Sequence, residues 1–257
     1  FDWYKRHEMS KTSIGYFPEV IAGPNFEHPE AFIVMSEICE VSDMIIAAVK
    51  LSKLGRDHWD DVDRWLRNQL AEAQFTDLNQ VTELQKKGYP ELSVPQHHRD
   101  YFYRDGQYTT ENVVNRGLGG FAGQPSINDK MGYPERFHTL VNCCSGNGVR
   151  TFFHVWRDML TYKKTRPRMW VGGGESDQGK LQVHLLLNRA SKWADIHSYI
   201  PYTGRVDVKS KQEIDLEIRI PEWVKPAEVR CEVEGKARKL SFDGRYAKLG
   251  WLRPGEV

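Results

Sequence analysis

The sequence has no long apolar run and almost no net charge. Its longest apolar stretches, such as Ala31–Met35 and Met44–Val49, are far shorter than the roughly 18 residues of a membrane-spanning helix. The 36 lysines and arginines nearly balance the 35 aspartates and glutamates, so the chain has neither a basic patch for nucleic acid nor an acidic tail. We therefore expect a soluble protein that has neither a membrane nor a nucleic acid as a partner.

Cysteine is also scarce, with four residues in 257. Four cysteines in a chain of this length do not form a disulfide scaffold, and Cys143 and Cys144 are adjacent in sequence. This usage favours either a metal site or a reducing compartment, and we expect the cytoplasm. A hydrophobic content of 40% excludes a disordered chain, and the length suits one or two domains.

The chain ends predict that more of the protein exists. The sequence begins at Phe1 without an initiator methionine or an apolar signal core. Pro254-Gly255 predicts a turn that leads into another strand, but only two residues follow it. We therefore expect that both ends are cut and that the chain is a piece of a larger protein.

The first part of the chain is expected to be helical. Apolar residues recur at helical spacing over Val41–Leu54, Asp60–Phe75 and Val149–Tyr162. Residues 76–142 are polar and irregular, with several glycines clustered at 117–123. A loop of that length in a compact domain usually lines a ligand site.

After Gly172–Gly174 the spacing of apolar residues changes to alternation. Strands are predicted at 181–187, 206–208, 214–220 and 229–233, with turn residues between them. We expect a β-sandwich or a similar domain here, with a boundary near 172–180 and Cys231 in its core.

Three cysteines and one glutamate form a candidate metal site. Cys143 and Cys144 lie just before a predicted helix, whose N-terminus favours thiolates. Glu37 and Cys39 precede an earlier helix, and the four side chains together would make an S₃O ligand set suited to tetrahedral zinc. The spacing lacks the C-x-x-C pairs of common zinc modules, so small buried cysteines are the alternative interpretation.

Other residues offer further alternatives. His97 and His98 could be metal ligands, although a histidine pair in a polar loop is usually solvated. His138 could act as the base for Cys143 in a Cys-His hydrolase. Glu19 has apolar neighbours that would raise its pKa by desolvation.

Several motifs together resemble one enzyme family. They are Ser-Glu37-Ile-Cys39-Glu, Trp59-Asp-Asp-Val-Asp-Arg-Trp-Leu-Arg-Asn68, Cys143-Cys144-Ser-Gly-Asn147, Val183-His-Leu-Leu-Leu-Asn188 and Ile218-Arg-Ile-Pro-Glu-Trp223. This combination resembles the β-L-arabinofuranosidase family of glycoside hydrolases, family 127 and its relatives, and the resemblance covers nearly the whole chain. The Cys-Cys-Ser-Gly-Asn run differs from the Cys-Cys-Pro-Pro-Asn of typical members.

The resemblance implies an α+β multidomain protein. Residues 1–172 would be the C-terminal part of an (α/α)₆ barrel, a six-hairpin catalytic domain, and residues 173–257 would be a truncated β-sandwich domain. The preceding half of the barrel, in the same protein or in a separate chain, would be a partner that completes the pocket. This fragment alone would then be inactive.

The resemblance also implies a zinc-dependent retaining glycosidase that acts on a carbohydrate. Glu37, Cys39, Cys143 and Cys144 would bind Zn²⁺, and Cys143 would also be the nucleophile that forms a thioglycosyl intermediate. Glu19 is the favoured acid/base because Ile14-Gly15 precedes it at a suitable distance from Glu37. Glu30 is the alternative because His28-Pro-Glu30-Ala-Phe32 better matches the local motif. A non-catalytic carbohydrate-binding or scaffold protein with a structural zinc is the rival hypothesis.

Overall fold

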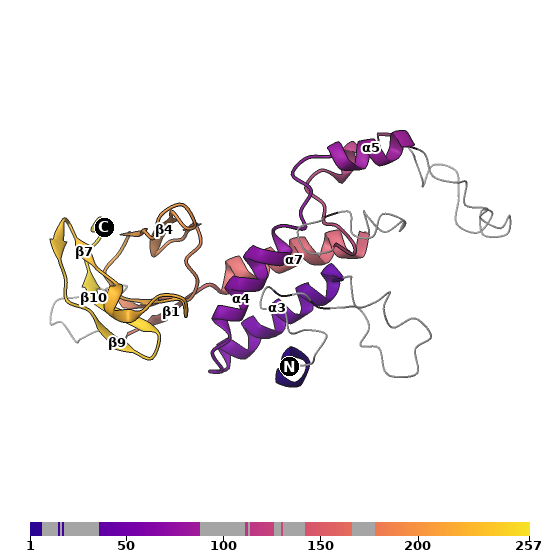
Figure 1. The fold of residues 1–257 in the computed structure, drawn as a ribbon. Helices are drawn as coiled ribbons and strands as arrows, with labels where there is room; N and C mark the ends of the chain where they lie inside the picture. Colours follow the sequence, from indigo (N-terminus) through magenta and orange to yellow (C-terminus); the bar gives the residue numbers. More distant parts are fainter. Residues whose placement is uncertain are drawn as a thin grey trace. The chain divides into compact units, whose positions relative to one another are not determined.

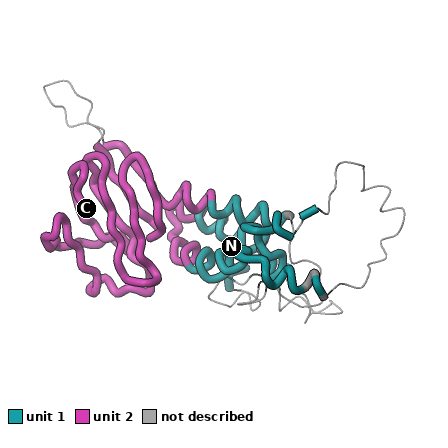
Figure 2. The backbone as a smooth tube through the Cα atoms, turned by 90° about the horizontal axis from the view of Figure 1, so that it is seen from above, with its two compact units in different colours: residues 1–50, 64–152 teal, residues 51–63, 153–257 magenta. Residues whose placement is uncertain are grey.

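The chain forms two compact units. The computed structural model of the 257-residue chain describes residues 1–6, 15, 17, 36–87, 111, 112, 114–125, 130, 142–165 and 178–257. Unit 1 comprises residues 1–50 and 64–152, and unit 2 comprises residues 51–63 and 153–257 (Figure 2). The domain border expected at residues 172 and 173 stays a prediction.

The helices lie mostly in the first 160 residues (Figure 1). They are α1 (Asp2–Arg6), α3 (Ile38–Lys53), α4 (Trp59–Trp65), the π-helix η2 (Leu66–Leu70), α5 (Asn79–Lys87), the 3₁₀-helix η3 (Asn115–Gly117), α7 (Asn142–Asp158) and the 3₁₀-helix η4 (Pro226–Glu228). No helix within these described ranges is both long enough and apolar enough to cross a membrane.

The helix predicted at 41–54 is confirmed as α3, which begins slightly earlier. Ile38, Val41, Ile45 and Ala48 are buried at spacings of three and four residues, which places them on one face of the helix. The helix predicted at 60–75 is shorter in the structure. Helix α4 continues directly into η2, and this helical segment ends at Leu70.

The predicted bounds of the helix at 149–162 are wrong at both ends. Helix α7 already begins at Asn142, and Leu160–Lys164 forms the strand β1 instead. Gly146 and Gly148, which have low helix propensity, suggested a loop, but tertiary packing overrides that preference. The apolar residues Phe153 and Trp156 are about half exposed, so the predicted stripe is not the buried face of α7 in the described residues.

Unit 2 contains a five-stranded sheet of order β1-β2-β6-β10-β9, a three-stranded sheet of order β3-β4-β5 and the hairpin β7-β8. The strands are β1 (Leu160–Lys164), β2 (Gly179–Val183), β3 (Arg189–Ala190), β4 (Ala194–Ser198), β5 (Val206–Ser210), β6 (Ile214–Arg219), β7 (Glu232–Val233), β8 (Lys236–Ala237), β9 (Ser241–Asp243) and β10 (Tyr246–Leu252). The pair β2 and β6 is parallel, and the other pairs are antiparallel.

The strand predicted at 214–220 is confirmed as β6, but the predicted alternation of buried and exposed residues stops after Leu216, since Glu217 and Arg219 are buried and Ile218 is only partly buried. Ile214 and Leu216 are fully buried, and the charged residues Glu217 and Arg219 further along the strand are buried as well, with 4% exposure each. Lys180 and Gln182 on β2 donate hydrogen bonds to the Glu217 carboxylate at 2.6 and 2.8 Å. The buried charge of Glu217 is therefore compensated by partners on the neighbouring strand β2.

Two ionic contacts attach the segment Leu51–Asp63 to the sheet of unit 2. Arg219 on β6 donates to Asp57 Oδ2 at 3.0 and 3.1 Å, and to Asp60 Oδ1 at 2.9 Å. Burial of the guanidinium opposes its charge, but its hydrogen bonds to Asp60 and Asp57 more than offset this and raise the pKa of Arg219. This ion-pair cluster explains why the start of α4 belongs to unit 2.

Cys231 is half-buried rather than in the core. The predicted strand 229–233 shortens to Glu232–Val233, so the alternation around Cys231 does not continue into a packed sheet. With these helices and sheets, the described residues form an α+β protein.

Candidate metal centre

Glu37 directly precedes α3, which begins at Ile38, and its two carboxylate oxygens have different partners. Oε2 accepts a hydrogen bond from the Glu40 backbone N–H at 3.3 Å, which is an N-terminal cap of the helix. Oε1 accepts from the Cys144 thiol at 3.1 Å. The backbone N–H of Glu37 donates to the Phe17 carbonyl at 3.2 Å, which fixes the chain just before the helix. The cap therefore positions Oε1 toward α7.

A backbone segment at 121–125 joins the first turns of α3 and α7. The Gly123 carbonyl accepts from the Ile38 N–H at 3.1 Å and from the Cys144 thiol at 3.5 Å. The Phe121 N–H donates to Ser145 Oγ at 3.2 Å. In the sequence, only the glycine cluster at 117–123 indicated that this segment lies near the site. It did not predict the hydrogen bonds to the two helices.

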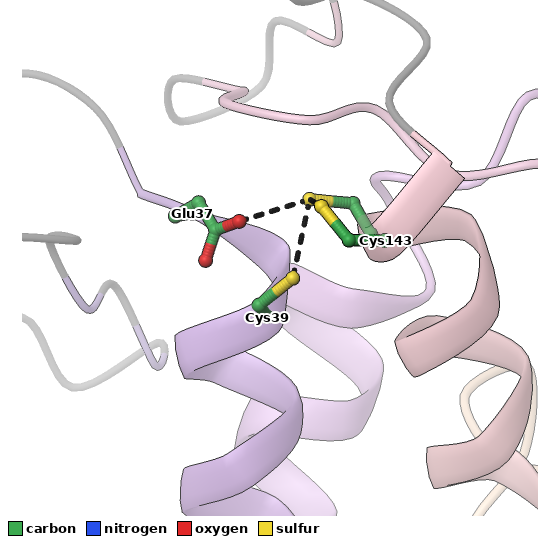
Figure 3. A group of neighbouring side chains, drawn as sticks. Glu37, Cys39 and Cys143 are labelled. Atoms are coloured by element: carbon green, nitrogen blue, oxygen red, sulfur yellow. Dashed lines mark hydrogen bonds between the residues drawn. The ribbon is translucent and has the colours of Figure 1, made fainter.

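The glutamate and the three thiols converge between the two helix starts, as predicted from the sequence (Figure 3). Cys144 Sγ lies 3.5 Å from Cys39 Sγ and 3.8 Å from Cys143 Sγ. The four ligand atoms all lie within 4.8 Å of one another. Thiolates bound to tetrahedral zinc at about 2.3 Å are separated by about 3.8 Å, so these distances suit a shared metal ion.

The two cysteines of α7 lie inside its first turn rather than before it. The prediction of a turn entering the helix is wrong in this respect, because α7 starts at Asn142. Cys144 is buried, whereas Cys143 is exposed and Cys39 is half-buried. Cys143 therefore presents the most accessible thiol of the cluster.

Without a metal, the surroundings of Cys39 and Cys144 disfavour the thiolate forms of these two side chains. Burial, followed by the adjacent Glu37, raises the pKa of Cys39 to about 12 and raises the pKa of Cys144 further. Burial opposes the charge of Glu37, but hydrogen bonds from Glu40, Cys39 and Cys144 lower its pKa overall. A metal ion would have to displace the protons of these thiols, so binding would release them.

Several predicted site residues lie outside the described residues. Among them are both acid/base candidates, Glu19 and Glu30, and the histidines His97, His98 and His138. Their predicted roles stay predictions.

Comparison with known proteins finds similarity among solved structures but not among known sequences. No protein-family profile matches the sequence, and no curated protein sequence is significantly similar to it. The fold is similar to the crystal structure of a GH127 β-L-arabinofuranosidase from Geobacillus stearothermophilus T6, with 17% sequence identity and a TM-score of 0.44. The match covers 86% of this chain and 31% of that enzyme, so this chain spans about a third of the enzyme's length.

Proposed function

We propose that this chain is the metal-binding part of a retaining glycoside hydrolase that acts on β-L-arabinofuranosides or related glycosides. The observation that carries the proposal is the cluster of Glu37, Cys39, Cys143 and Cys144, in which three thiols and a carboxylate meet within 4.8 Å. The order of these residues along the chain supports the same enzyme family. The exposure of Cys143 supports its role as the nucleophile.

Zn²⁺ bound by these four residues would keep the thiols deprotonated at neutral pH. The Cys143 thiolate then attacks the anomeric carbon while the bond from that carbon to the leaving oxygen breaks. Glu19, or Glu30 in its place, donates a proton to the leaving oxygen. The same carboxylate next removes a proton from water, whose oxygen attacks the anomeric carbon and displaces Cys143 as a thiolate. Two inversions at one carbon give net retention.

The proposal extends to the parts of the protein around the cluster. Residues 1–172 would belong to the C-terminal part of an (α/α)₆ barrel, and residues 173–257 would form a β-sandwich domain. The preceding barrel helices, in the same protein or in a separate chain, would complete the carbohydrate pocket. The described cysteines are all free, which supports a reducing compartment such as the cytoplasm.

Metal content and Cys143→Ser together test the proposal. We expect about one zinc per chain by mass spectrometry of protein purified without chelator, and loss of turnover of an aryl β-L-arabinofuranoside in Cys143→Ser. The assay is run with the chain alone and with the preceding barrel helices added. Cys231→Ser is the matched control, because Cys231 lies in the other unit.

Two results would overturn the proposal. A chain without zinc has no such metal centre, and full turnover by Cys143→Ser excludes that thiol as the nucleophile. Zinc binding without any turnover, even with the barrel helices present, would favour the rival hypothesis of a carbohydrate-binding or scaffold protein with a structural metal.

A further inference from the structure

Arg189 on β3 is a half-buried cation without an acceptor. Its Nε and Nη1 are enclosed by the protein, yet neither has a hydrogen-bond partner in the part of the chain that the structure describes. The guanidinium carbon lies 4.1 Å from the centre of the Trp156 ring, which makes a cation–π contact. Enclosed donors without an acceptor are costly, and burial lowers the pKa of Arg189. Such a group indicates that the acceptor comes from outside these residues.

The acidic side chain whose charge acts on Arg189 is Asp158, and it already has other partners. Asp158 Oδ1 accepts from Lys53 Nζ at 2.9 Å and from Arg157 Nε at 3.1 Å, and Oδ2 accepts from Arg157 Nη2 at 2.6 Å. Three cations therefore surround one carboxylate, which leaves an excess of positive charge within unit 2 (Figure 2). This excess favours an anionic ligand.

Two aromatic rings beside these cations are open to solvent. Trp156 is 48% exposed and Phe153 is 54% exposed, both near the end of α7. Arg157 lies over the Phe153 ring, 5.6 Å from its centre. The faces of a sugar ring carry C–H groups that pack against aromatic rings, whereas a small inorganic anion has no apolar surface to bury. Rings and cations together therefore suit a ligand that is both a sugar and an anion.

We propose that Arg189, Arg157 and Trp156 form a binding site for a uronic acid residue of an acidic carbohydrate. The sugar carboxylate accepts hydrogen bonds from the guanidinium of Arg189, and the sugar ring packs against the exposed aromatic side chains. The proposal takes its ligand class from the proposed function, but it depends neither on the metal nor on turnover. The metal cluster lies in unit 1, whereas this site lies in unit 2.

Binding of trigalacturonate to the full chain tests this site, with isothermal titration calorimetry as the measurement. We expect Arg189→Gln to weaken this binding by roughly tenfold or more, because a hydrogen bond between two charged groups is lost. Methyl-esterified trigalacturonate keeps the sugar rings but has no charge, so its affinity for the wild-type chain should be reduced to a similar extent. Trp156→Ala should also weaken the binding of trigalacturonate, because it removes the ring.

Arg205→Gln is the matched control. Arg205 also lies over an aromatic ring, 5.4 Å from the centre of Tyr199, but its guanidinium already binds the Asp207 carboxylate at 2.7 and 2.8 Å. This variant should bind trigalacturonate like the wild-type chain. Circular dichroism confirms the fold of each variant. If Arg189→Gln does not fold, Trp156→Ala and the esterified ligand provide the answer.

Three results would overturn the site: no binding of trigalacturonate to the wild-type chain, equal affinity in Arg189→Gln, or equal affinity for the esterified ligand. A triglutamate peptide that binds as tightly as trigalacturonate would assign the surface to acidic polypeptides, which also overturns the carbohydrate site. The proposed glycosidase fails by different results, which are a chain without zinc or full turnover by Cys143→Ser. Neither of these results would change the affinity for trigalacturonate.

Discussion

Both units bury polar groups, but these groups are satisfied in different ways. In unit 2, Arg219 has two aspartate partners, and His184 receives a hydrogen-bond partner at each ring nitrogen, Tyr246 and Thr161, both at 2.7 Å. In unit 1, the thiols of Cys39 and Cys144 share a single carboxylate and have strongly raised pKa values. The polar groups of unit 2 are satisfied by protein groups alone. The thiols and the carboxylate of unit 1 are better satisfied by a bound cation.

The largest difference between the units should appear on zinc binding. A ligand at a thousandfold excess over its Kd stabilises the folded protein by about 4 kcal/mol. Because the ligands come from the first turns of α3 and α7, zinc should slow backbone hydrogen exchange in residues 41–49 and 149–155. Exchange in β6 should be much less affected. Mass spectrometry of peptic fragments measures both.

Magnesium is the control for this experiment, because it prefers oxygen ligands and should protect neither region. Equal protection of β6 and α3 by zinc would contradict the contrast between the units.

The ion-pair cluster of unit 2 should respond to mutation without any effect on the metal. Arg219→Met leaves Asp60, whose side chain is 17% exposed, without its cation. Breaking such a buried pair lowers the free energy of unfolding by about 3 kcal/mol. The double variant Arg219→Met/Asp60→Asn should recover part of this loss, because it removes the uncompensated charge. Urea unfolding measures stability, and zinc content should match wild type.

Arg230→Ala is the matched control, because Arg230 is an exposed arginine of the same unit. An equal loss of stability in Arg230→Ala would show that the ion pairs with the aspartates do not explain the effect of Arg219→Met.

Acid should destabilise the protein through His184. Burial lowers the pKa of His184 to about 4 in the folded state, against 6.5 for the free side chain, and the charges of Asp57, Arg219 and Asp158 modify it further. The unfolded chain therefore takes up the proton first as the pH falls. The contribution of His184 to the free energy of unfolding is fully present above pH 6.5 and decreases toward pH 4. We expect a loss of about 2 kcal/mol by pH 5.

His184→Gln removes this proton uptake, so its free energy of unfolding should vary less with pH between 6.5 and 4. The lowered pKa values of Asp158 and Glu217 add a further loss of stability, which begins near their ordinary values of 3.8 and 4.5 and continues as the pH falls. An unchanged slope in His184→Gln would assign the acid sensitivity to other groups.

The sequence predicted which four residues cluster better than it predicted the structure around them. Glu37, Cys39, Cys143 and Cys144 were grouped because their thiols lie near two predicted helix starts and because their order along the chain resembles an enzyme family. Their convergence depends on contacts across more than 100 residues, which no local pattern encodes.

The bounds of α7 and the burial of β6 show why the rest was not predictable. Local propensity placed the start of α7 after Gly148, but the helix begins at Asn142 and includes both glycines, of which Gly148 packs against Phe121. Alternation placed Glu217 and Arg219 toward solvent, and only the fold shows that Lys180 and Asp60 cover them. Partners that are distant in sequence decide both cases.

The smallest expected effect is the difference in stability between alanine substitutions at the two glycines of α7, Gly146 and Gly148. A Cβ atom at Gly148 would lie 2.6 Å from ring carbons of Phe121, whereas a Cβ at Gly146 meets nothing within 4 Å. Gly146→Ala should stabilise the helix by up to about 1 kcal/mol through propensity. Gly148→Ala gains the same propensity but forces Phe121 to move, at a cost of about 1–3 kcal/mol, so its net effect should be destabilising.

Zinc affinity distinguishes Gly146→Ala from Gly148→Ala more specifically than thermal unfolding does. Phe121 begins the segment whose Gly123 carbonyl accepts from Ile38 and Cys144, so a displaced ring should also disturb the ligand cluster. Gly148→Ala should therefore bind zinc more weakly than Gly146→Ala in competition with a chromophoric chelator. Equal zinc affinity in the two variants would mean that the segment tolerates the shift, and that the helix starts alone fix the ligands.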